Sequence, residues 1–409
     1  MLILKLAFRN IFRQKRRSLY TALSIIIGFT LLSVSIGLAE GGYGHLIERF
    51  TGSYTGHIQV HRAGYLERPG LYKNFQYNDE LIKSLNSFSE IKSYTPRIHS
   101  GSLAFIDKQT TGVRLIGIYP TLEQRTTTVS AKLGEGRFIS ETTLEEPHNE
   151  MVIGHGVAEV LNADIGSEIV LIGQGADGSI ANDIFKVVGI MREENNSTEL
   201  TKCYVHLYKA QEFLAMYGRV HEVAVVLDSY KGAQTVSHRM QRVLGDAALD
   251  VSPWQKVEEV FYKSMQADKA GNKVMIVVII LVVGLGVLNT VLMSILERSR
   301  EFGVMKAMGT TPVKIGLIII TETVILSVMA ATLSIFTALL ANWPLVKYGI
   351  KYDQPLSVGG IYFDAIYSDW VYDAFMTPYV VVVLTATAVS LFPAVKAMLV
   401  KPVDAIKTY

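Results

Sequence analysis

Four long apolar stretches constrain the fold of this chain more than any other feature of its sequence. They cover residues 19–39, 274–296, 313–341 and 379–399. Each is long enough to cross about 30 Å of hydrocarbon as a helix of about 20 residues. The first stretch is too long for the apolar core of a signal peptide, so we interpret it as an uncleaved anchor. The sequence therefore predicts a membrane protein with four transmembrane α-helices.

Basic residues set the predicted orientation of these helices. Residues 1–18 contain no acidic residue and carry a run of cations, namely Lys5, Arg9, Arg13, Lys15, Arg16 and Arg17. By the positive-inside rule this arm lies in the cytoplasm. It follows that 40–273 and 342–378 lie outside, whereas the turn 297–312 and the tail 400–409 lie inside. The arm also alternates apolar and basic residues at roughly helical spacing, so it either only orients the chain or forms an amphipathic helix along the inner headgroups.

The segment 40–273 is predicted to form a large extracytoplasmic α+β domain between the first two spans. Its patterns alternate between strand and helix. Strands are expected at 57–61, 103–106, 113–118 and 222–227, and helices at 79–85, capped by Asn78, and at 231–244. A further helix is expected to run from Val257 directly into the second span. The middle strands 151–154, 168–172 and 184–190 are separated by Gly and Asp turns, which predicts an inserted strand-rich subdomain.

Composition and local motifs argue against several functions. The 39 basic and 37 acidic residues give no overall field that would favour nucleic acid. The single cysteine, Cys203, excludes an internal disulfide framework and is expected to be a packed side chain. Residues 173–178 match a dinucleotide fingerprint, but a strand pattern follows instead of the required helix, so we predict a hairpin loop. His57 and His61 would stand about 13 Å apart on a strand, too far to share a metal ion unaided. We find no catalytic constellation and expect a non-catalytic chain without a bound cofactor or metal.

The turn 297–312 between the second and third spans is the most informative segment. Phe302, Met305 and Met308 can share one face of a short helix, with Gly309 at its C-terminal cap. Thr311 and Pro312 suit the N-cap and first position of the next helix. A short helix with an apolar stripe and a charged border is a surface that a soluble partner can grip. The alternative is a simple connector.

This turn, Glu297-Arg298-Ser299-Arg300-Glu301-Phe302-Gly303-Val304-Met305-Lys306-Ala307-Met308-Gly309, resembles the FtsX-like, MacB-type permease superfamily of ABC transporters. The family's corresponding turn has the pattern E-R-x-R-E-x-G-x-x-K-A-x-G. The resemblance extends over 6–17, 151–190, 287–308 and 393–406, and in organisation over the whole chain. Residues 56–61 look most like the permeases of the lipoprotein-releasing type. The resemblance implies a membrane-proximal mixed α/β subdomain and a more distal strand-rich one.

The resemblance also implies partners. The turn would be a coupling helix that docks on a separate ABC ATPase. The residues expected to couple it to the ATPase are Arg300, Glu301, Phe302, Gly303, Met305, Lys306, Met308 and Gly309. No phosphate-binding G-x-x-x-x-G-K-[ST] motif occurs in this chain, so ATP and Mg²⁺ are expected on that ATPase, in two copies. A second permease copy or paralogue would complete the assembly. The implied location is the bacterial inner membrane, multi-pass, with both termini cytoplasmic.

Glu322 is the acidic side chain that lies well inside a predicted span, about 14 Å beyond Val313 at about 1.5 Å per residue. It must be neutralised or hydrogen-bonded there. The other three spans offer no titratable group at comparable depth, which argues against a proton relay. We expect a structural hydrogen bond to a neighbouring helix or to a paired subunit, with Asn289 as a candidate partner.

The leading functional hypothesis is that the chain helps extract lipoproteins from the outer leaflet and passes them to a periplasmic carrier by ATP-driven mechanotransmission. One alternative within the superfamily is export of a toxin, antibiotic or peptide, and another is control of a cell-wall hydrolase. A non-transporting receptor or scaffold is a hypothesis of a different class. Lipids of the membrane are expected partners in each case, and nucleic acid is not.

Overall fold

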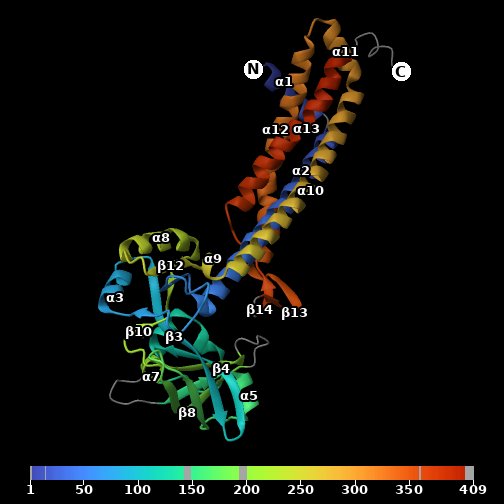
Figure 1. The fold of residues 1–409 in the computed structure, drawn as a ribbon. Helices are drawn as coiled ribbons and strands as arrows, with labels where there is room; N and C mark the ends of the chain where they lie inside the picture. Colours follow the sequence, from blue (N-terminus) through green and yellow to red (C-terminus); the bar gives the residue numbers. More distant parts are fainter. Residues whose placement is uncertain (1, 14, 142–148, 193–199, 359–360, 401–409) are drawn as a thin grey trace. The chain divides into compact units, whose positions relative to one another are not determined.

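The computed structural model describes residues 2–13, 15–141, 149–192, 200–358 and 361–400 (Figure 1). The chain divides into two compact units. The first, here the helical unit, comprises residues 1–45, 265–355 and 364–409. The second, here the sheet unit, comprises residues 46–264 and 356–363. Residues 401–409, which include the family-like ending 402–405 of the predicted tail, lie outside the described residues.

Four long helices are apolar enough to cross a membrane among the described residues. They are α2 (Lys15–Phe50), α10 (Glu259–Glu297), α12 (Pro312–Lys347) and α13 (Asp373–Leu399). The four predicted spans are thus confirmed as helices, and each helix continues beyond the apolar stretch that identified it. These extensions carry charged and polar residues, which is why hydropathy alone did not include them. The segment between α12 and α13 also holds two strands, β13 (Ile350–Val358) and β14 (Ile361–Ile366).

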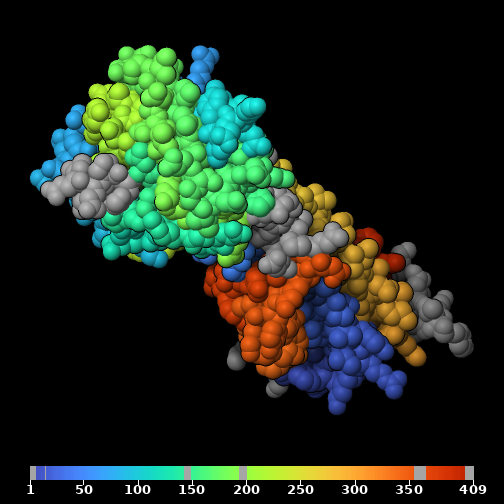
Figure 2. Space-filling model, turned by 90° about the horizontal axis from the view of Figure 1, so that it is seen from below, coloured from blue at the N-terminus to red at the C-terminus, as the bar shows by residue number. Residues whose placement is uncertain are grey.

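The helical unit packs around a common core in which all four long helices take part. Phe29 of α2, Val287 of α10, Ala331 of α12 and Ala386 of α13 belong to this buried cluster. Small residues such as alanine let membrane helices approach closely, so that packing contacts rather than water exclusion hold them together. In Figure 2 the blue residues that begin the chain lie beside the orange and red residues of α12 and α13.

Two shorter helices complete the helical unit. The arm 2–13 forms the helix α1 (Leu2–Arg13), and α11 (Ser299–Ala307) lies between α10 and α12. On α1, Ala7 and Ile11 are buried whereas Phe8 and Phe12 are half exposed. This two-sided arrangement is what the alternation of apolar and basic residues predicts for an amphipathic helix.

The sheet unit contains strands and short helices in mixed order. Its elements are β1 (Ile58–Arg62), β2 (Phe75–Gln76), α3 (Asp79–Asn86), β3 (Ile91–Ile106), β4 (Gln109–Ile118), α4 (Pro120–Thr126), η2 (Val129–Lys132), β5 (Leu133–Gly136), β6 (Glu150–Ile153), α5 (His155–Leu161), β7 (Glu168–Gln174), β8 (Ile180–Met191), β9 (Lys202–His206), α7 (Leu207–Phe213), β10 (Arg219–Val220), β11 (Glu222–Leu227), α8 (Ala233–Leu244), β12 (Leu249–Pro253) and α9 (Trp254–Val257). The predicted α+β class is confirmed.

One strand, β3, joins the two halves of this sheet. Its first part pairs with β11, which continues to β1 and β12. Its last residues pair with β7, and β7 pairs with β8, β8 with β6, β6 with β9, β9 with β4, and β4 again with β3. These six strands therefore form a closed ring, which leaves no open edge between them. The strand-rich part that we expected as a separate insert shares β3 and β4 with the rest of the sheet.

Local predictions in the sheet unit can be compared residue by residue. Asn78 caps α3, since its side chain accepts a hydrogen bond from the backbone N–H of Leu81 at 3.0 Å. Residues 173–178 lie in the β7–β8 hairpin, as predicted. The expected helix that runs directly into the second span is α10, but it begins at Glu259 and not at Val257, because Glu258 has non-helical angles of φ −109° and ψ 52°. The carboxylate of Glu258 instead accepts a hydrogen bond from Thr55 at 3.1 Å.

Candidate functional site

The turn between α10 and α12 is a compact structure closed at both ends. Arg298 precedes α11 with non-helical backbone angles, and Gly309 follows it with φ +91°. The N–H of Gly309 bonds the carbonyl of Lys306 at 2.9 Å, and that of Thr310 bonds Met305 at 3.0 Å. A positive φ of this kind is what glycine supplies at the end of a helix. The predicted helix, C-terminal glycine and proline start of the next helix are therefore all present.

Phe302 does not occupy the position that we expected. Its side chain is fully buried in the core of the helical unit, in the same cluster as Ile295, Ile315 and Ile319. The expectation that it is the apolar anchor offered to a partner is therefore wrong. Helical spacing indicates which residues share a face of the helix, but not whether that face points into the bundle or toward solvent. Met308, by contrast, is 74% exposed.

Two other predicted residues also bind the turn to its own chain. Lys306 donates hydrogen bonds to the carbonyls of Met398 and Val400 at the end of α13, at 2.7 and 2.6 Å. Carbonyls at a helix C-terminus lack partners within the helix, so a cation stabilises them. Glu301 accepts from Arg298 Nε at 3.2 Å and forms an ion pair with Arg13 of α1. Gly303 is buried. The exposed face of the turn is instead formed by Arg300, Val304, Ala307, Met308 and Gly309.

The intramembrane carboxylate has a different partner from the one expected. Glu322 Oε2 lies 3.0 Å from Arg298 Nη1, and both side chains are largely buried. Asn289 is exposed on α10 and lines another cavity, so the prediction of a Glu322–Asn289 bond is wrong. We had assigned Arg298 to the aqueous turn. A long side chain can reach back from a helix end into the bundle, which sequence position does not reveal.

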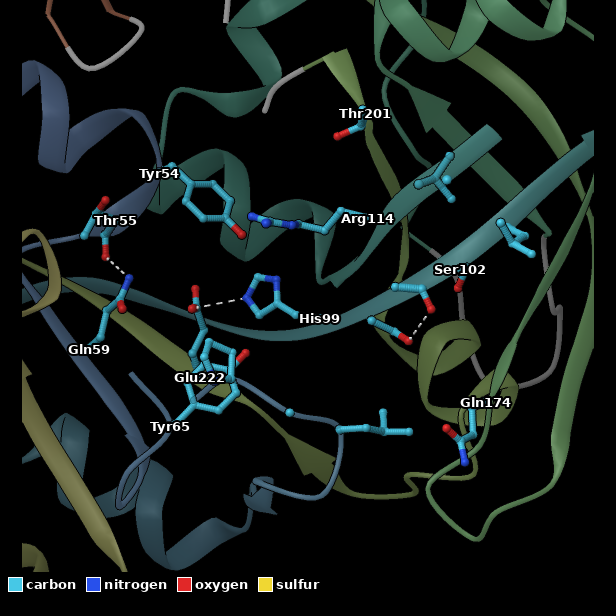
Figure 3. A pocket seen from close by; sticks show the side chains of 18 of the residues that line it. Tyr54, Thr55, Gln59, Tyr65, His99, Ser102, Arg114, Gln174, Thr201 and Glu222 are labelled. Atoms are coloured by element: carbon cyan, nitrogen blue, oxygen red, sulfur yellow. Dashed lines mark hydrogen bonds and ion pairs between the residues drawn. The ribbon is translucent and has the colours of Figure 1, made fainter. Parts of the chain in front are cut away.

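The sheet unit contains a cavity of about 980 Å³ with a polar floor (Figure 3). Glu222 of β11 and His99 of β3 face each other there, with His99 Nε2 3.2 Å from Glu222 Oε2. Tyr65 and Gln59 lie beside this pair, and Arg114 extends toward Tyr54. The floor therefore carries both signs of charge.

A fully buried arginine underlies this floor. Arg97 donates to both oxygens of Glu123, at 2.9 and 2.6 Å, and to Glu222 at 2.8 Å. Its guanidinium also lies 4.1 Å from the centre of the Tyr54 ring. Bidentate and cation–π contacts of this kind compensate a buried guanidinium for the water it loses. Burial acts to raise the pKa of the Glu222 carboxyl, but its interactions with His99 and Arg97 outweigh burial and hold that pKa well below its usual range.

Two buried histidines of this unit are neutral. His221 Nδ1 accepts the N–H of His99 at 3.0 Å, so its Nε2 carries the hydrogen and donates to the carbonyl of Leu71 at 3.0 Å. His57 Nδ1 accepts the N–H of Leu227 at 3.0 Å. Burial lowers the pKa of each ring to about 4. His57 and His61 contact different groups, since His61 Nε2 lies 2.8 Å from Gln59 Oε1.

Sequence reasoning missed the Arg97–Glu123–Glu222–His99 network. Its members come from β3, α4 and β11, up to 125 residues apart. No local spacing links them, and the one available signal is the inward position of charged residues on apolar strands.

Within the described residues, no group of three His, Cys, Asp or Glu side chains is placed to hold a metal ion. Cys203 is a buried, packed side chain, and burial raises the pKa of its thiol.

Together, four membrane-crossing helices and a large α+β domain between the first two define the class: an integral membrane protein with one large domain outside the bilayer core. Residues 18–243 match the MacB-like periplasmic core domain, and residues 273–398 match the FtsX-like permease C-terminal domain. The first match alone covers more than half of the chain. This chain belongs to the MacB and FtsX type of ABC transporter permeases, which confirms the family resemblance of the turn.

Several relatives illustrate this membership. The chain is 23% identical to the uncharacterized ABC transporter permease YvrN of Bacillus subtilis over 99% of this chain and 98% of that protein. It is 21% identical to the macrolide export ATP-binding/permease protein MacB of Aggregatibacter actinomycetemcomitans, over 76% of this chain and 48% of that protein, so it spans about half the length of that relative. It is 20% identical to the lipoprotein-releasing system transmembrane protein LolC of Neisseria meningitidis, over 57% of this chain and 56% of that protein. The solved periplasmic region of MacB from Actinobacillus actinomycetemcomitans matches 53% of this chain and 98% of that chain at 15% identity, with a TM-score of 0.39.

Proposed function

We propose that this chain is the permease subunit of an ABC transporter whose ATP and Mg²⁺ bind to a separate ATPase, present in two copies. The observation that carries this proposal is the exposed face of α11 and its cap. Arg300, Val304 and Met308 point away from the bundle, while Phe302 on the opposite face is buried in it. A helix fixed in this way can transmit force from a docked partner, because it cannot move without moving the core that holds it.

The same proposal includes the assembly and its orientation. Family membership implies an ATPase partner and a dimeric arrangement. We infer a second copy or a paralogue as the other permease, in the bacterial inner membrane. The basic residues of α1 support the proposal that both termini are cytoplasmic and that residues 40–273 and 342–378 lie on the outer side.

For the cargo, we propose lipoproteins, extracted from the outer leaflet and handed to a periplasmic carrier by mechanotransmission. The relative LolC and the lipoprotein-release-like segment 56–61, most of which forms β1, support this choice. The MacB relatives support export of a toxin, antibiotic or peptide equally well. Regulation of a cell-wall hydrolase is a further member of the same class. A receptor or scaffold without transport would leave the exposed face of α11 without a role.

Depletion of the chain in its host separates these cargo proposals. If it releases lipoproteins, acylated proteins destined for the outer membrane should accumulate in the inner-membrane fraction after depletion. Unchanged lipoprotein sorting together with increased sensitivity to macrolides would favour export instead. A chain carrying Met308→Asp should behave like the depletion, because it reaches the membrane but presents a charge to the ATPase.

The orientation is tested by labelling. A cysteine at Ser179, in a Cys203→Ser background, should react with an impermeant thiol reagent in intact spheroplasts. Ser179 lies in the exposed β7–β8 hairpin loop, so access is not limited by burial. Labelling only after lysis would contradict the proposed orientation.

A further inference from the structure

The carboxylates that line the cavity of the sheet unit already have partners within the chain (Figure 3). Glu222 accepts a hydrogen bond from Arg97 on one oxygen, at 2.8 Å, and its other oxygen lies 3.2 Å from His99 Nε2. Glu258 accepts a hydrogen bond from Thr55 at 3.1 Å. No ligand is needed to explain the burial of these two acidic groups.

Two hydrogen-bond donors in the same lining have no partner. The guanidinium of Arg114 extends into the cavity toward Tyr54 and makes no hydrogen bond or ion pair within the described part of the chain. The side chain of Tyr65 is only 7% exposed, yet its hydroxyl makes no hydrogen bond there either. A buried polar group without a partner costs free energy, so such groups are rare. Burial and the charge of Glu222 raise the pKa of Tyr65, which the nearby charge of Arg114 only partly offsets, so the hydroxyl keeps its proton.

Two glycines leave the middle of the cavity open. Gly101 of β3 lies opposite Arg114 of β4, and Gly112 of β4 lies opposite Leu103 of β3. Beyond the chain neighbours, a Cβ added at either glycine would meet no described atom within 4 Å, and neither glycine has a positive φ. Neither backbone conformation nor packing therefore requires glycine here. Glycine inside a strand weakens it and often marks a place that a ligand approaches closely.

The cavity has an apolar wall beside these glycines. Leu103 and Ile172 are paired across β3 and β7, and they are 50% and 37% exposed. Leu71 and Val257 line the cavity from two other segments. The volume of about 980 Å³ falls within the range of about 300 to 1,000 Å³ that is typical of small-molecule sites. The lining thus combines unpaired donors with a surface that suits an apolar group.

The charges around the cavity are balanced. Three carboxylates and three cations lie in the lining or directly beneath it, namely Glu123, Glu222 and Glu258 with Arg97, Lys202 and Arg114. An incoming anion therefore meets no net negative charge. Because the unpaired polar groups are donors, the ligand that completes them must offer acceptors.

We propose that this cavity binds a small amphipathic carboxylate, which is a molecule with one carboxylate group and an apolar body. Arg114 and the hydroxyl of Tyr65 donate hydrogen bonds to the carboxylate, and the apolar body lies over the two glycines against Leu103. The planar fork of an arginine matches the two oxygens of a carboxylate. This site depends neither on the cargo of the transporter nor on its ATPase.

The test measures binding of N-acetyl-phenylalanine, a soluble carboxylate with an aromatic body, to the full chain in nanodiscs. Equilibrium dialysis of the radiolabelled probe, with empty nanodiscs as the blank, separates binding by the chain from partition into lipid. The parent should bind the probe saturably, and about tenfold more tightly than the neutral N-acetyl-phenylalanine amide. Arg114→Gln should weaken binding of the acid about tenfold, and Tyr65→Phe about fivefold, by the loss of their hydrogen bonds.

Gly112→Val is a steric test that does not change any charge. Valine is favoured in strands, and its side chain would enter the cavity and not the core. The unfolding temperature of this variant should therefore not fall, whereas probe binding should weaken at least about tenfold. Retained probe binding would contradict the placement of the apolar body over the glycines.

The matched control is Lys108→Gln, which removes an exposed cation from the turn between β3 and β4, outside the cavity. It should bind the probe as the parent does. The proposal is overturned if the parent shows no saturable binding, if it binds the acid and the amide equally, or if Lys108→Gln and Arg114→Gln lose binding equally. It is also overturned if Gly112→Val keeps probe binding but changes the number of chains that assemble, because a second copy then occupies the cavity.

Discussion

The two units of this molecule use buried charge in different ways. In the sheet unit, Arg97 is fully buried between Glu123 and Glu222, and the three side chains join two strands and a helix. In the helical unit, Arg298 bonds Glu301 on the turn and Glu322 in the bundle. The first network lies beneath a cavity floor and holds a core together. The second fixes a surface helix to the bundle, leaving its other face free.

The largest effect is expected from removing the buried arginine of the sheet unit. Arg97→Leu would leave Glu123 and Glu222 buried without their cation, a change that typically costs about 3 to 5 kcal/mol. The midpoint of thermal unfolding of the sheet unit should fall by about 10 °C. Limited proteolysis of the full chain at increasing temperature measures this. Arg114→Gln, on the exposed rim of the same cavity, is the control and should leave the midpoint unchanged.

A second large effect is expected in the core of the helical unit. Phe302→Ala removes a fully buried ring from the cluster that contains Ile315 and Ile319, and the cavity should cost about 3 kcal/mol. The variant should unfold at lower temperature even when no ATPase is present. If Phe302→Ala has the stability of the parent when no ATPase is present, Phe302 acts only in binding a partner.

Acidification should weaken the sheet unit through its neutral histidines. The pKa of His57 and of His221 is about 4 in the fold, below the ordinary value of 6.5. As the pH falls, the unfolded chain therefore binds protons at a higher pH than the folded chain does. The contribution of these histidines to the free energy of unfolding is fully present above pH 6.5 and is lost as the pH falls toward 4. Each histidine should cost about 2 kcal/mol between pH 7 and pH 5.

Unfolding curves of the full chain at pH 7 and pH 5 test this, with the sheet unit followed by proteolysis. In His57→Gln the decrease in the free energy of unfolding from pH 7 to pH 5 should be smaller by the contribution of one histidine. The glutamine carbonyl can still accept the N–H of Leu227, so the native bond need not be lost. An unchanged pH dependence in this variant would contradict the assignment.

The sequence predicted the elements of both units well and the contacts within them less well. The four spans, the strand 222–227 and the Asn78 cap follow from local patterns of hydropathy and capping. The closed ring of strands does not, since β3 pairs with three different strands far along the chain. Long-range register is set by packing, and no short motif encodes it.

The candidate site shows the same limit at the level of single residues. The repeat of Phe302, Met305 and Met308 correctly indicated a short helix. It could not tell which face the bundle would cover, because both faces of α11 carry an apolar side chain. The partner of Glu322 was missed for a related reason, since Arg298 reaches into the bundle from a position that charge counting assigns to water.

The smallest expected effect concerns the exposed face of the turn, and it separates the two roles of α11. Met308 is 74% exposed, so its truncation leaves the core of the helical unit intact. Burial of a methionine against a partner contributes about 1.5 to 3 kcal/mol when complete. Partial burial therefore predicts that Met308→Ala weakens ATPase binding about tenfold, or about 1.4 kcal/mol, with an unchanged unfolding temperature. Arg300→Gln should cost less, and its effect should disappear at high salt, because an exposed charge acts mainly through screened attraction. Titration of the ATPase onto the chain in nanodiscs measures both variants. If Met308→Ala and Val304→Ala bind the ATPase as the parent does, this face is not the docking surface, and the buried side of α11 only ties two spans together.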